Sequence, residues 1–317
     1  MIKKKYNILI SGASGFIGMM LIEELLSKGH NVYGLVRKNI NRFNDENYTN
    51  ILLEDITKKI NFNKNINIDY FYHLAAKTHD RTNNRDEYYR VNVEGLKNIL
   101  GSISKLKINK IIMLSSIKVN GEGFLNNDKV YSHNSKENPL DFYGKSKLEA
   151  EILLKKFCKT NKINFVIFRP PLVYGAGVKG NLSSLMNFID KNIPMPIVRT
   201  KNLRSLVSLT NLVDALIIIG LDNQINNKTY LIADDKPISV EELYKKIASS
   251  MNKKLFLITL PSKLLKILLW PMGKAKLVDK ISTSLIIDNT EIKRDTNWKN
   301  KLSLSEELKN MIDNRKP

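Results

Sequence analysis

A chain of 317 residues is long enough to bury a large core, and its 51 lysines and arginines against 31 acidic residues give a formal net charge of +20. The one cysteine, Cys158, excludes a disulfide framework within the chain. Two explanations of the charge stay open, a nucleic-acid partner and a bias of composition towards Lys, Asn and Ile. The lysines are spread along the chain without a basic tail, so we expect no nucleic-acid partner.

The first apolar run, residues 6–11, follows three lysines, as a secretory leader would. A leader needs about 7–15 apolar residues and a cleavage site, so we expect a first β-strand instead. No stretch of the sequence reaches the roughly 18 uninterrupted apolar residues of a membrane span. A cytoplasmic protein without a transmembrane segment is the expectation.

The first 170 residues alternate short apolar runs with helical patterns. The predicted strands are residues 7–11, 31–36, 51–53, 70–74, 110–115 and 165–169, and the predicted helices are residues 15–28, 85–106 and 142–160. Apolar strands that alternate with helices indicate an α/β protein with a Rossmann-type, doubly wound parallel sheet.

After Pro170 the alternation becomes irregular. The patterns predict strands at residues 205–207 and 230–233, a helix at residues 211–221, and mostly helix beyond them. We expect a first domain over residues 1–170 and a smaller, mostly helical C-terminal cap over residues 171–317, with segments that return to the first domain. The cap should cover the carboxyl edge of the sheet, where ligands of such folds bind.

A glycine-rich segment joins the first predicted strand to the first predicted helix, with the spacing G-x-x-G-x-x-G. The first glycine permits a tight turn, the second lets the backbone approach a pyrophosphate, and the third lets the helix pack on the sheet. The helix N-terminus stabilises the phosphate charge. Residues 1–170 are therefore predicted to bind NAD or NADP, through Gly12, Ser14, Gly15, Phe16, Ile17 and Gly18.

The end of the second predicted strand bears on the choice of dinucleotide. NAD enzymes typically place an acid there for the ribose 2′-hydroxyl, whereas this chain has Arg37 and Lys38. Arg37 could pair with a 2′-phosphate, which favours NADP, or be a solvated loop charge. Asp55, followed by Ile56 after the third predicted strand, could accept a hydrogen bond from adenine or cap a following helix.

Tyr143 and Lys147 lie four residues apart at the start of a predicted helix, so both face one side of it. A lysine cation about 4–5 Å from a phenol contributes roughly 3–4 kcal/mol at an effective dielectric near 20, which lowers the phenol pKa by about two units or more. Such a tyrosine can exchange a proton with an alcohol or ketone near neutral pH. Ser115 or Ser116, after the fifth predicted strand, could hydrogen-bond the same oxygen.

These motifs resemble those of the extended short-chain dehydrogenases/reductases, in the NAD(P)-dependent sugar-nucleotide epimerase/dehydratase family. The likeness covers nearly the whole chain. Its further motifs are His73-Leu74-Ala75-Ala76, Val91-Asn92-Val93-Glu94-Gly95, Arg169-Pro170-Pro171-Leu172-Val173-Tyr174-Gly175 and residues 288–298. The resemblance implies that Ser116, Tyr143 and Lys147 are catalytic, with Tyr143 as the acid/base and Lys147 as its activator and a ribose ligand.

The resemblance also implies binding residues. Besides the glycine loop, the cofactor set comprises Arg37, Asp55, Ile56, Leu74, Ala75, Ala76, Asn92, Tyr143 and Lys147. Within that set, Asn92 is expected to support the active-site loop. The substrate set comprises Ser116, Lys118, Asn181 and Arg204, of which Asn181 and Arg204 would hold the nucleotide diphosphate.

Two segments depart from the best-known epimerases. Leu172 stands where an asparagine contacts the nucleotide, and Val119-Asn120-Gly121 replaces Val-Tyr-Gly. The two segments that contain these departures resemble those of the bacterial UDP-N-acetylquinovosamine 4-dehydrogenases. This resemblance implies reduction of a UDP-4-keto-6-deoxy-N-acetylhexosamine at C4, in surface-polysaccharide biosynthesis. Two alternatives stay open, a 4-epimerase of a UDP-sugar or polyprenyl-diphosphate sugar with tightly bound NAD, and a non-enzymatic NADP-binding regulator. A homodimer is a further expectation.

Residues 260–277 are an apolar stretch interrupted by lysines, with Trp270 and Pro271 inside it. The stretch could be a buried helix of the cap, or a helix in weak contact with an anionic membrane surface. His73 lies in an apolar context and is expected to be a core residue. Because no Cys and His residues cluster at metal-ligand spacing, no metal site is predicted.

Overall fold

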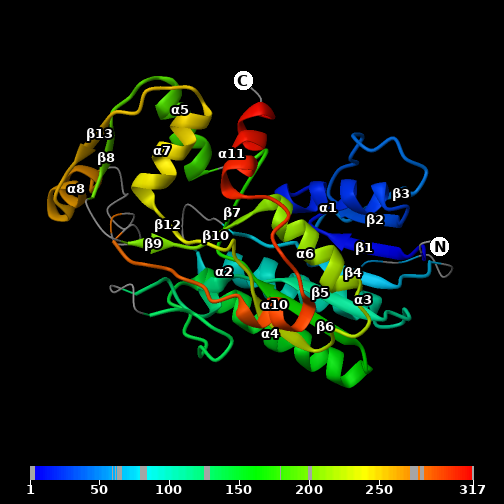
Figure 1. Cartoon of the computed structure of the whole chain (residues 1–317). Helices are drawn as coiled ribbons and strands as arrows, with labels where there is room; N and C mark the ends of the chain where they lie inside the picture. The colour runs from blue at the N-terminus through cyan, green and yellow to red at the C-terminus, as the bar shows by residue number, and fades with distance from the viewer. Residues whose placement is uncertain are drawn as a thin grey trace.

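The computed structural model of the chain describes residues 4–58, 60, 62, 66–78, 84–124, 129–178, 180–198, 202–271, 278 and 282–315. Seven of the described strands form one parallel sheet in the order β11-β6-β5-β4-β1-β2-β3 (Figure 1). Their bounds are β1 Asn7–Ser11, β2 Asn31–Val36, β3 Tyr48–Leu52, β4 Tyr70–His73, β5 Lys110–Leu114, β6 Asn164–Arg169 and β11 Lys228–Leu231. The order confirms the predicted doubly wound sheet and places its switch point between β1 and β4.

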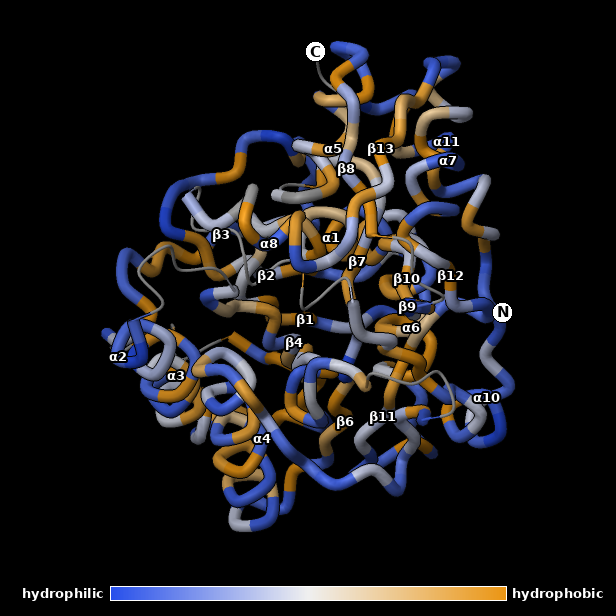
Figure 2. The backbone as a smooth tube through the Cα atoms, turned by 90° about the vertical axis from the view of Figure 1, so that its left-hand side faces the viewer, coloured by the Kyte–Doolittle hydropathy of each residue, from blue (hydrophilic) through white to orange (hydrophobic). Residues whose placement is uncertain are grey.

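The strands form where the sequence is apolar enough to be covered on both faces. Every residue of β4 is buried, and so are four of the five residues of β1. In Figure 2, hydrophobic stretches run along central strands such as β6, while α3 and α4 alternate between hydrophobic and hydrophilic turns. The edge strand β3 starts at Tyr48, three residues before the predicted start, because its backbone pairs with β2 although Thr49 and Asn50 are polar.

Helices cover both faces of the sheet. On one face, α1 (Phe16–Ser27) and α6 (Leu209–Leu221) bury Leu21, Leu25 and Leu216 in one hydrophobic cluster. On the other face, α3 (Gly95–Ile103) and α4 (Phe142–Asn161) bury Leu100 and Leu154 in a second cluster.

The single helix predicted over residues 85–106 is divided in the structure. It consists of α2 (Arg85–Tyr89), a π-helical turn (Arg90–Glu94) and α3. The π turn contains Asn92, which is buried and fully hydrogen-bonded. A π turn of this kind often marks a functional site.

The later half of the chain combines helices with small sheets. Its helices are α5 Asn181–Asp190, α7 Val240–Ser250, α8 Ser262–Leu269, α10 Thr290–Thr296 and α11 Leu304–Asp313. Its strand pairs are β7 Leu172–Tyr174 with β10 Leu206–Ser208, β9 Leu203–Arg204 with β12 Ile238–Ser239, and β8 Met195–Ile197 with β13 Leu257–Thr259. A third hydrophobic cluster joins α5, α7 and α11, whereas β11 pairs with β6 in the large sheet.

Among the described helices, none has both the length and the apolar composition needed to cross a membrane. The described part of the chain also contains no group of three or more His, Cys, Asp or Glu side chains placed to hold a metal ion.

Candidate active site

The glycine loop between β1 and α1 packs tightly against the loop that follows β4. Gly12 has a positive φ of 73°, and a Cβ there would lie 2.7 Å from the backbone nitrogen of Ala75. A Cβ on Gly18 would lie 2.3 Å from the carbonyl oxygen of Gly12. These two glycines are therefore required by the packing of the protein itself.

Gly15 has a different environment, which fits a ligand. A Cβ there would meet only the Gly12 carbonyl oxygen, at 3.0 Å. Gly15 is also the N-cap of α1 and supplies no side-chain cap, and Ser14 beside it is exposed. The N–H groups of the first turn, which begins at Phe16 and Ile17, can therefore donate to a pyrophosphate.

The predicted ribose and adenine contacts follow β2 and β3. Arg37 and Lys38 are both exposed directly after β2. Asp55 accepts hydrogen bonds from the backbone and hydroxyl of Thr57, both at 2.9 Å, and lies 3.5 Å from Arg90. The backbone hydrogen bond from Thr57 is the main cause of the lowered pKa of Asp55.

Asp55 therefore caps a turn. The alternative in which it caps a helix is wrong, because the residues after it form a turn. Its neighbour Ile56 packs against Gly95 of α3, where a Cβ would lie 2.8 Å from the Ile56 side chain.

The loop after β4 is held by two side chains from other segments. His73, at the end of β4, is buried and shares a 2.8 Å hydrogen bond with Ser11 through Nδ1. Asn92 accepts from the backbone N–H of Lys77 at 2.8 Å and donates to Ser146 of α4 at 2.9 Å. Asn92 thus ties the half-buried run that comprises Leu74, Ala75 and Ala76 to the helix that carries the predicted catalytic pair.

The charge state of His73 follows from its burial. Burial, followed by the positive charge of Lys147, lowers the pKa of His73 to about 3, so the imidazole is neutral. Its Nε2 has no hydrogen-bond partner among the described residues. These contacts agree with the expectation of a core histidine.

The two serines after β5 point to different partners. Ser115 is buried, and its hydroxyl donates to Glu151. Ser116 is half-buried and accepts a hydrogen bond from the Lys118 backbone at 3.3 Å. Its side chain lies close enough to the Tyr143 phenol to lower the pKa of that phenol. Of the two serines left open by the sequence, the structure places Ser116 beside Tyr143.

Helix α4 presents Tyr143 and Lys147 from one face, as their spacing predicts. The helix begins after Asp141, whose side chain accepts from the Gly144 backbone at 2.7 Å. Lys147 is buried and donates to the Leu114 carbonyl oxygen at the end of β5, at 2.7 Å. Burial lowers the pKa of Lys147 to about 8, against the opposing effect of Glu151.

The expected lowering of the Tyr143 pKa by Lys147 is wrong for this structure. Burial raises the pKa of Tyr143 to about 12. The groups that oppose burial by lowering this pKa are the Lys118 cation and the side chain of Ser116. Spacing along the helix predicted the shared face, but the burial of the phenol outweighs the effect of nearby charge.

Lys118 is the cation next to the Tyr143 ring, with Nζ 5.8 Å from the ring centroid. It forms ion pairs with Asp141 and, at 2.9 Å, with Glu122. Burial lowers the pKa of Lys118, but the hydrogen bonds that its ammonium donates to these two carboxylates outweigh burial, so its pKa is raised and it stays charged.

Glu151 and Arg169 form a buried ion pair behind the catalytic face, which the sequence reasoning missed. Arg169 lies at the end of β6 and contacts Glu151 at 2.9 Å through Nε and 2.6 Å through Nη2. Its other contacts are Asn120 at 3.1 Å and Glu137 at 3.0 Å. The available signal was the continuation of the four-residue spacing from Lys147 to Glu151.

Of the residues predicted to hold the nucleotide diphosphate, Arg204 is half-buried in β9. Its Nη1 donates to the Thr283 carbonyl oxygen at 3.2 Å. Burial lowers the pKa of Arg204, and the charge of Glu122, the partner of Lys118, opposes that shift. Asn181 begins α5, and its side chain lies outside the described part of the structure. Lys179 and residues 272–277 of the predicted 260–277 stretch also lie outside the described residues.

Comparison with protein families identifies the chain. Residues 8–233 match the model of the NAD dependent epimerase/dehydratase family, which is more than half of the sequence. The chain belongs to this family. It is accordingly an enzyme of the NAD-dependent sugar-nucleotide epimerase/dehydratase type, and the alternative of a non-enzymatic regulator is set aside.

Individual relatives agree with this membership. A UDP-glucose 4-epimerase of Vibrio cholerae is 33% identical over 97% of this chain and 94% of its own length. An N-acetyl-alpha-D-glucosaminyl-diphospho-ditrans,octacis-undecaprenol 4-epimerase of Escherichia coli O157:H7 is 27% identical over 80% of this chain and 75% of its own.

Among solved structures, the fold matches a UDP-glucuronic acid 4-epimerase of Bacillus cereus in complex with NAD, with a TM-score of 0.78 and 20% identity over 97% of this chain and 96% of that one. It also matches a UDP-glucose 4-epimerase of Thermotoga maritima with UDP-glucose, with a TM-score of 0.78 and 20% identity over 97% and 98%. These likenesses show the family fold along nearly the whole chain.

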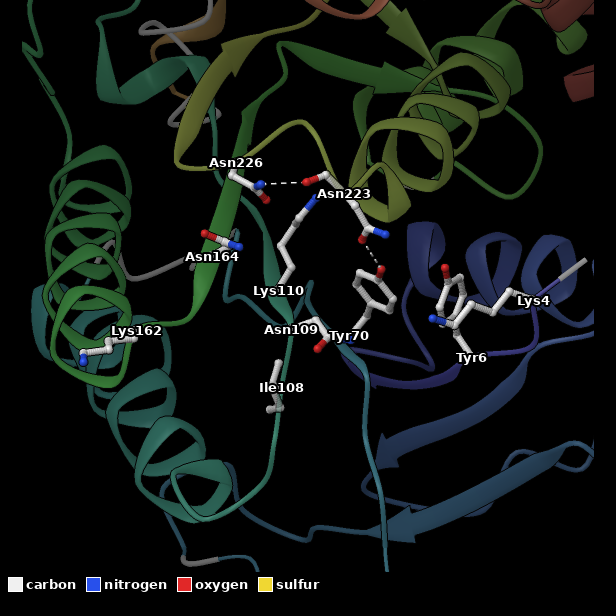
Figure 3. Close-up of a pocket in the computed structure, with 10 residues that line it drawn as sticks. All are labelled: Lys4, Tyr6, Tyr70, Ile108, Asn109, Lys110, Lys162, Asn164, Asn223 and Asn226. Atoms are coloured by element: carbon white, nitrogen blue, oxygen red, sulfur yellow. Dashed lines mark hydrogen bonds between the residues drawn. The ribbon is translucent and has the colours of Figure 1, made fainter.

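A cavity of about 480 Å³ lies at the opposite edge of the sheet from the family's motifs. Its lining comes from the amino ends of strands and the loop after α6, where Tyr70 donates to Asn223 at 2.9 Å (Figure 3). Lys110 donates there to the carbonyl oxygen of Asp222, at the C-terminal end of α6, which is a favourable place for a cation. We assign the active site to the carboxyl edge, because ligands of doubly wound sheets bind there.

Proposed function

We propose that the protein interconverts C4 epimers of a UDP-linked sugar, with Tyr143 as the acid/base and NAD(P) as the hydride carrier. The observation that carries the proposal is the meeting of Ser116 and Tyr143 at the carboxyl edge, in a chain of this family. The Vibrio cholerae relative, which matches along nearly the whole chain, supports epimerisation of a UDP-hexose.

The residues present fit a bound dinucleotide. The open backbone at Gly15 and the first-turn N–H groups of α1 would hold its pyrophosphate, and Leu74 to Ala76 would lie beside its nicotinamide ribose. A bound NAD(P) would supply the hydride acceptor for the sugar C4 and the hydride donor to the opposite face of the resulting ketone. Lys147, with a buried ammonium beside the end of β5, would donate to the ribose.

The protein's own part of the reaction is proton transfer at the C4 oxygen. With a pKa of about 12, the Tyr143 phenol is protonated at neutral pH and can donate to a ketone oxygen. In the other direction it must receive a proton from the C4 hydroxyl. Lys118 and the Ser116 hydroxyl would then stabilise the phenolate, because both lower its pKa.

We place the nucleotide diphosphate against Arg204 and Asn181, with Lys118 near the sugar. Arg204 donates to the Thr283 carbonyl oxygen, and the Thr283 hydroxyl donates to the Glu122 carbonyl oxygen at 3.5 Å. Because Glu122 pairs with Lys118 beside Tyr143, β9 lies close to the catalytic face of α4. A guanidinium in this position suits the bidentate recognition of phosphate oxygens.

A second reaction, reduction of a UDP-4-keto-6-deoxy-N-acetylhexosamine by NADPH, is favoured by one observation. Arg37 is exposed at the end of β2, where it can reach a 2′-phosphate. Both reactions use the same groups at C4 and differ in whether the cofactor returns its hydride to the same molecule.

Two assays separate the reactions. Nuclear magnetic resonance of UDP-glucose, UDP-galactose and their N-acetylated forms, incubated with purified protein without added cofactor, should show C4 interconversion. Absorbance at 340 nm with NADPH and a UDP-4-keto-6-deoxy sugar should stay constant. Net, stoichiometric NADPH oxidation without epimerisation would replace our first proposal with the second, and the absence of both activities would exclude each.

A further inference from the structure

Helix α8 exposes an apolar stripe on one side. Leu265 is buried and faces the protein, whereas Leu264 is exposed, Ile267 is 68% exposed and Trp270, at the C-cap, is 76% exposed. At about 100° per residue, the three exposed apolar side chains span about 120° of the helix, on the side opposite Leu265, and the exposed Lys263 lies within the same arc. The stripe is therefore turned away from the body of the protein.

Strand β13, two residues before α8, exposes apolar side chains as well. Ile258 of β13 and Phe256, the residue before the strand, are each about half exposed, and their spacing of two residues favours one side of the extended segment. Figure 1 shows β13, β8 and α8 together at the left margin of the cap, away from the large sheet. Exposed apolar groups gathered in this way mark an interaction site.

The charge of the segment indicates the kind of partner. Residues 251–270 contain no acidic residue and four exposed lysines, Lys253, Lys254, Lys263 and Lys266, of which Lys253 is ion-paired with Asp190 at 3.3 Å. A basic surface beside aromatic and aliphatic side chains is complementary to anionic lipid head groups over an acyl layer. A second copy of the chain fits less well, because a two-fold interface would bring the same four lysines together.

We propose that α8 and β13 dock the protein on the surface of an anionic lipid bilayer. Ile267 and Trp270 enter the boundary between head groups and acyl chains, and Lys263 and Lys266 face the head-group phosphates. This docking goes beyond the proposed reaction and requires no substrate, so its test is independent of any assay of turnover.

The first test is cosedimentation of the full-length protein with vesicles of phosphatidylcholine alone or mixed equally with phosphatidylglycerol. We expect sedimentation with the mixed vesicles and a fall in binding as salt is raised. The emission of Trp270 should shift to the blue on binding, because it is exposed, whereas Trp298 is buried. Trp270→Phe should abolish the shift.

Matched variants locate the surface. Ile267→Asp, and Lys263→Glu with Lys266→Glu, should each weaken binding at least about tenfold, since each lysine near an anionic surface contributes about fivefold. The controls are Ile152→Asp and Lys156→Glu with Lys159→Glu on the exposed side of α4, which should bind like the wild type.

Equal binding to both kinds of vesicle, or equal losses in the α8 and α4 variants, would overturn the proposal. Light scattering on the same samples tests whether a second copy of the chain covers this surface instead. A wild-type dimer that Ile267→Asp converts to a monomer, without binding to vesicles, would assign the surface to a second copy of the chain and contradict docking on lipid.

Discussion

At opposite edges of the large sheet, Lys147 and Lys110 are each 2% exposed and each donate to a backbone carbonyl. Burial lowers the pKa of both to about 8. Their surroundings differ, because Lys147 lies one helical turn from Tyr143 and one from Glu151, whereas Lys110 lies beside a cavity and the end of α6. A perturbed lysine is thus common to both edges, and only the neighbouring groups distinguish a candidate catalytic site from a structural one.

The largest expected effect is on turnover at the carboxyl edge. Tyr143→Phe removes the proton donor while keeping the ring, so kcat should fall by about 10²–10⁴-fold. Cofactor binding, measured by titration of the retained or added dinucleotide, should be nearly unchanged. Turnover equal to that of the wild type would remove Tyr143 from the mechanism.

The buried ion pair between Glu151 and Arg169, behind the same edge, should contribute to the free energy of unfolding. Glu151→Ala leaves the guanidinium of Arg169 with Glu137 and Asn120 only, and breaking a buried pair costs about 3–5 kcal/mol. Urea unfolding should show the loss as a lower midpoint. Glu151→Gln, which keeps the shape, is the control and should lose less, and equal stability of Glu151→Ala and wild type would contradict the pairing.

Substitution of each lysine tests directly whether Lys147 and Lys110 differ in their effect on activity. Lys147→Met should lower kcat/KM for the UDP-sugar at least about tenfold, because the ammonium beside the end of β5 is lost from the site. Lys110→Met should leave kcat/KM within about twofold. If both variants lose activity equally, the two edges do not differ in the way proposed.

A further prediction concerns stability and pH. The pKa of Lys110 is lowered from 10.5 to about 8 in the folded protein, so the unfolded chain binds the proton more tightly between these values. The free energy of unfolding should therefore gain a positive contribution as pH rises from 8 to 10.5. In Lys110→Met this contribution should be absent, which denaturation at pH 7, 9 and 10.5 can measure. An identical pH profile in both proteins would count against a buried ammonium at this edge.

Local features of the sequence predicted much of the fold and part of the site. The alternation of apolar runs and helical patterns predicted the doubly wound sheet, because burial on both faces requires apolar strands. The spacing of Gly12, Gly15 and Gly18 predicted the turn into α1, and the spacing of Tyr143 and Lys147 predicted their shared face on α4. Each of these depends on backbone geometry over a few residues.

Only the tertiary structure decided which distant groups meet. Glu151 and Arg169 are 18 positions apart, and Lys118 and Asp141 are 23 apart, so their pairing depends on how strand ends and helix starts come together at the carboxyl edge. The pKa of Tyr143 likewise depends on how much of the phenol is removed from water, which spacing cannot specify. Apolar periodicity depends on residues that are close in the sequence. Desolvation and ion pairing instead arise between segments that only folding brings into contact.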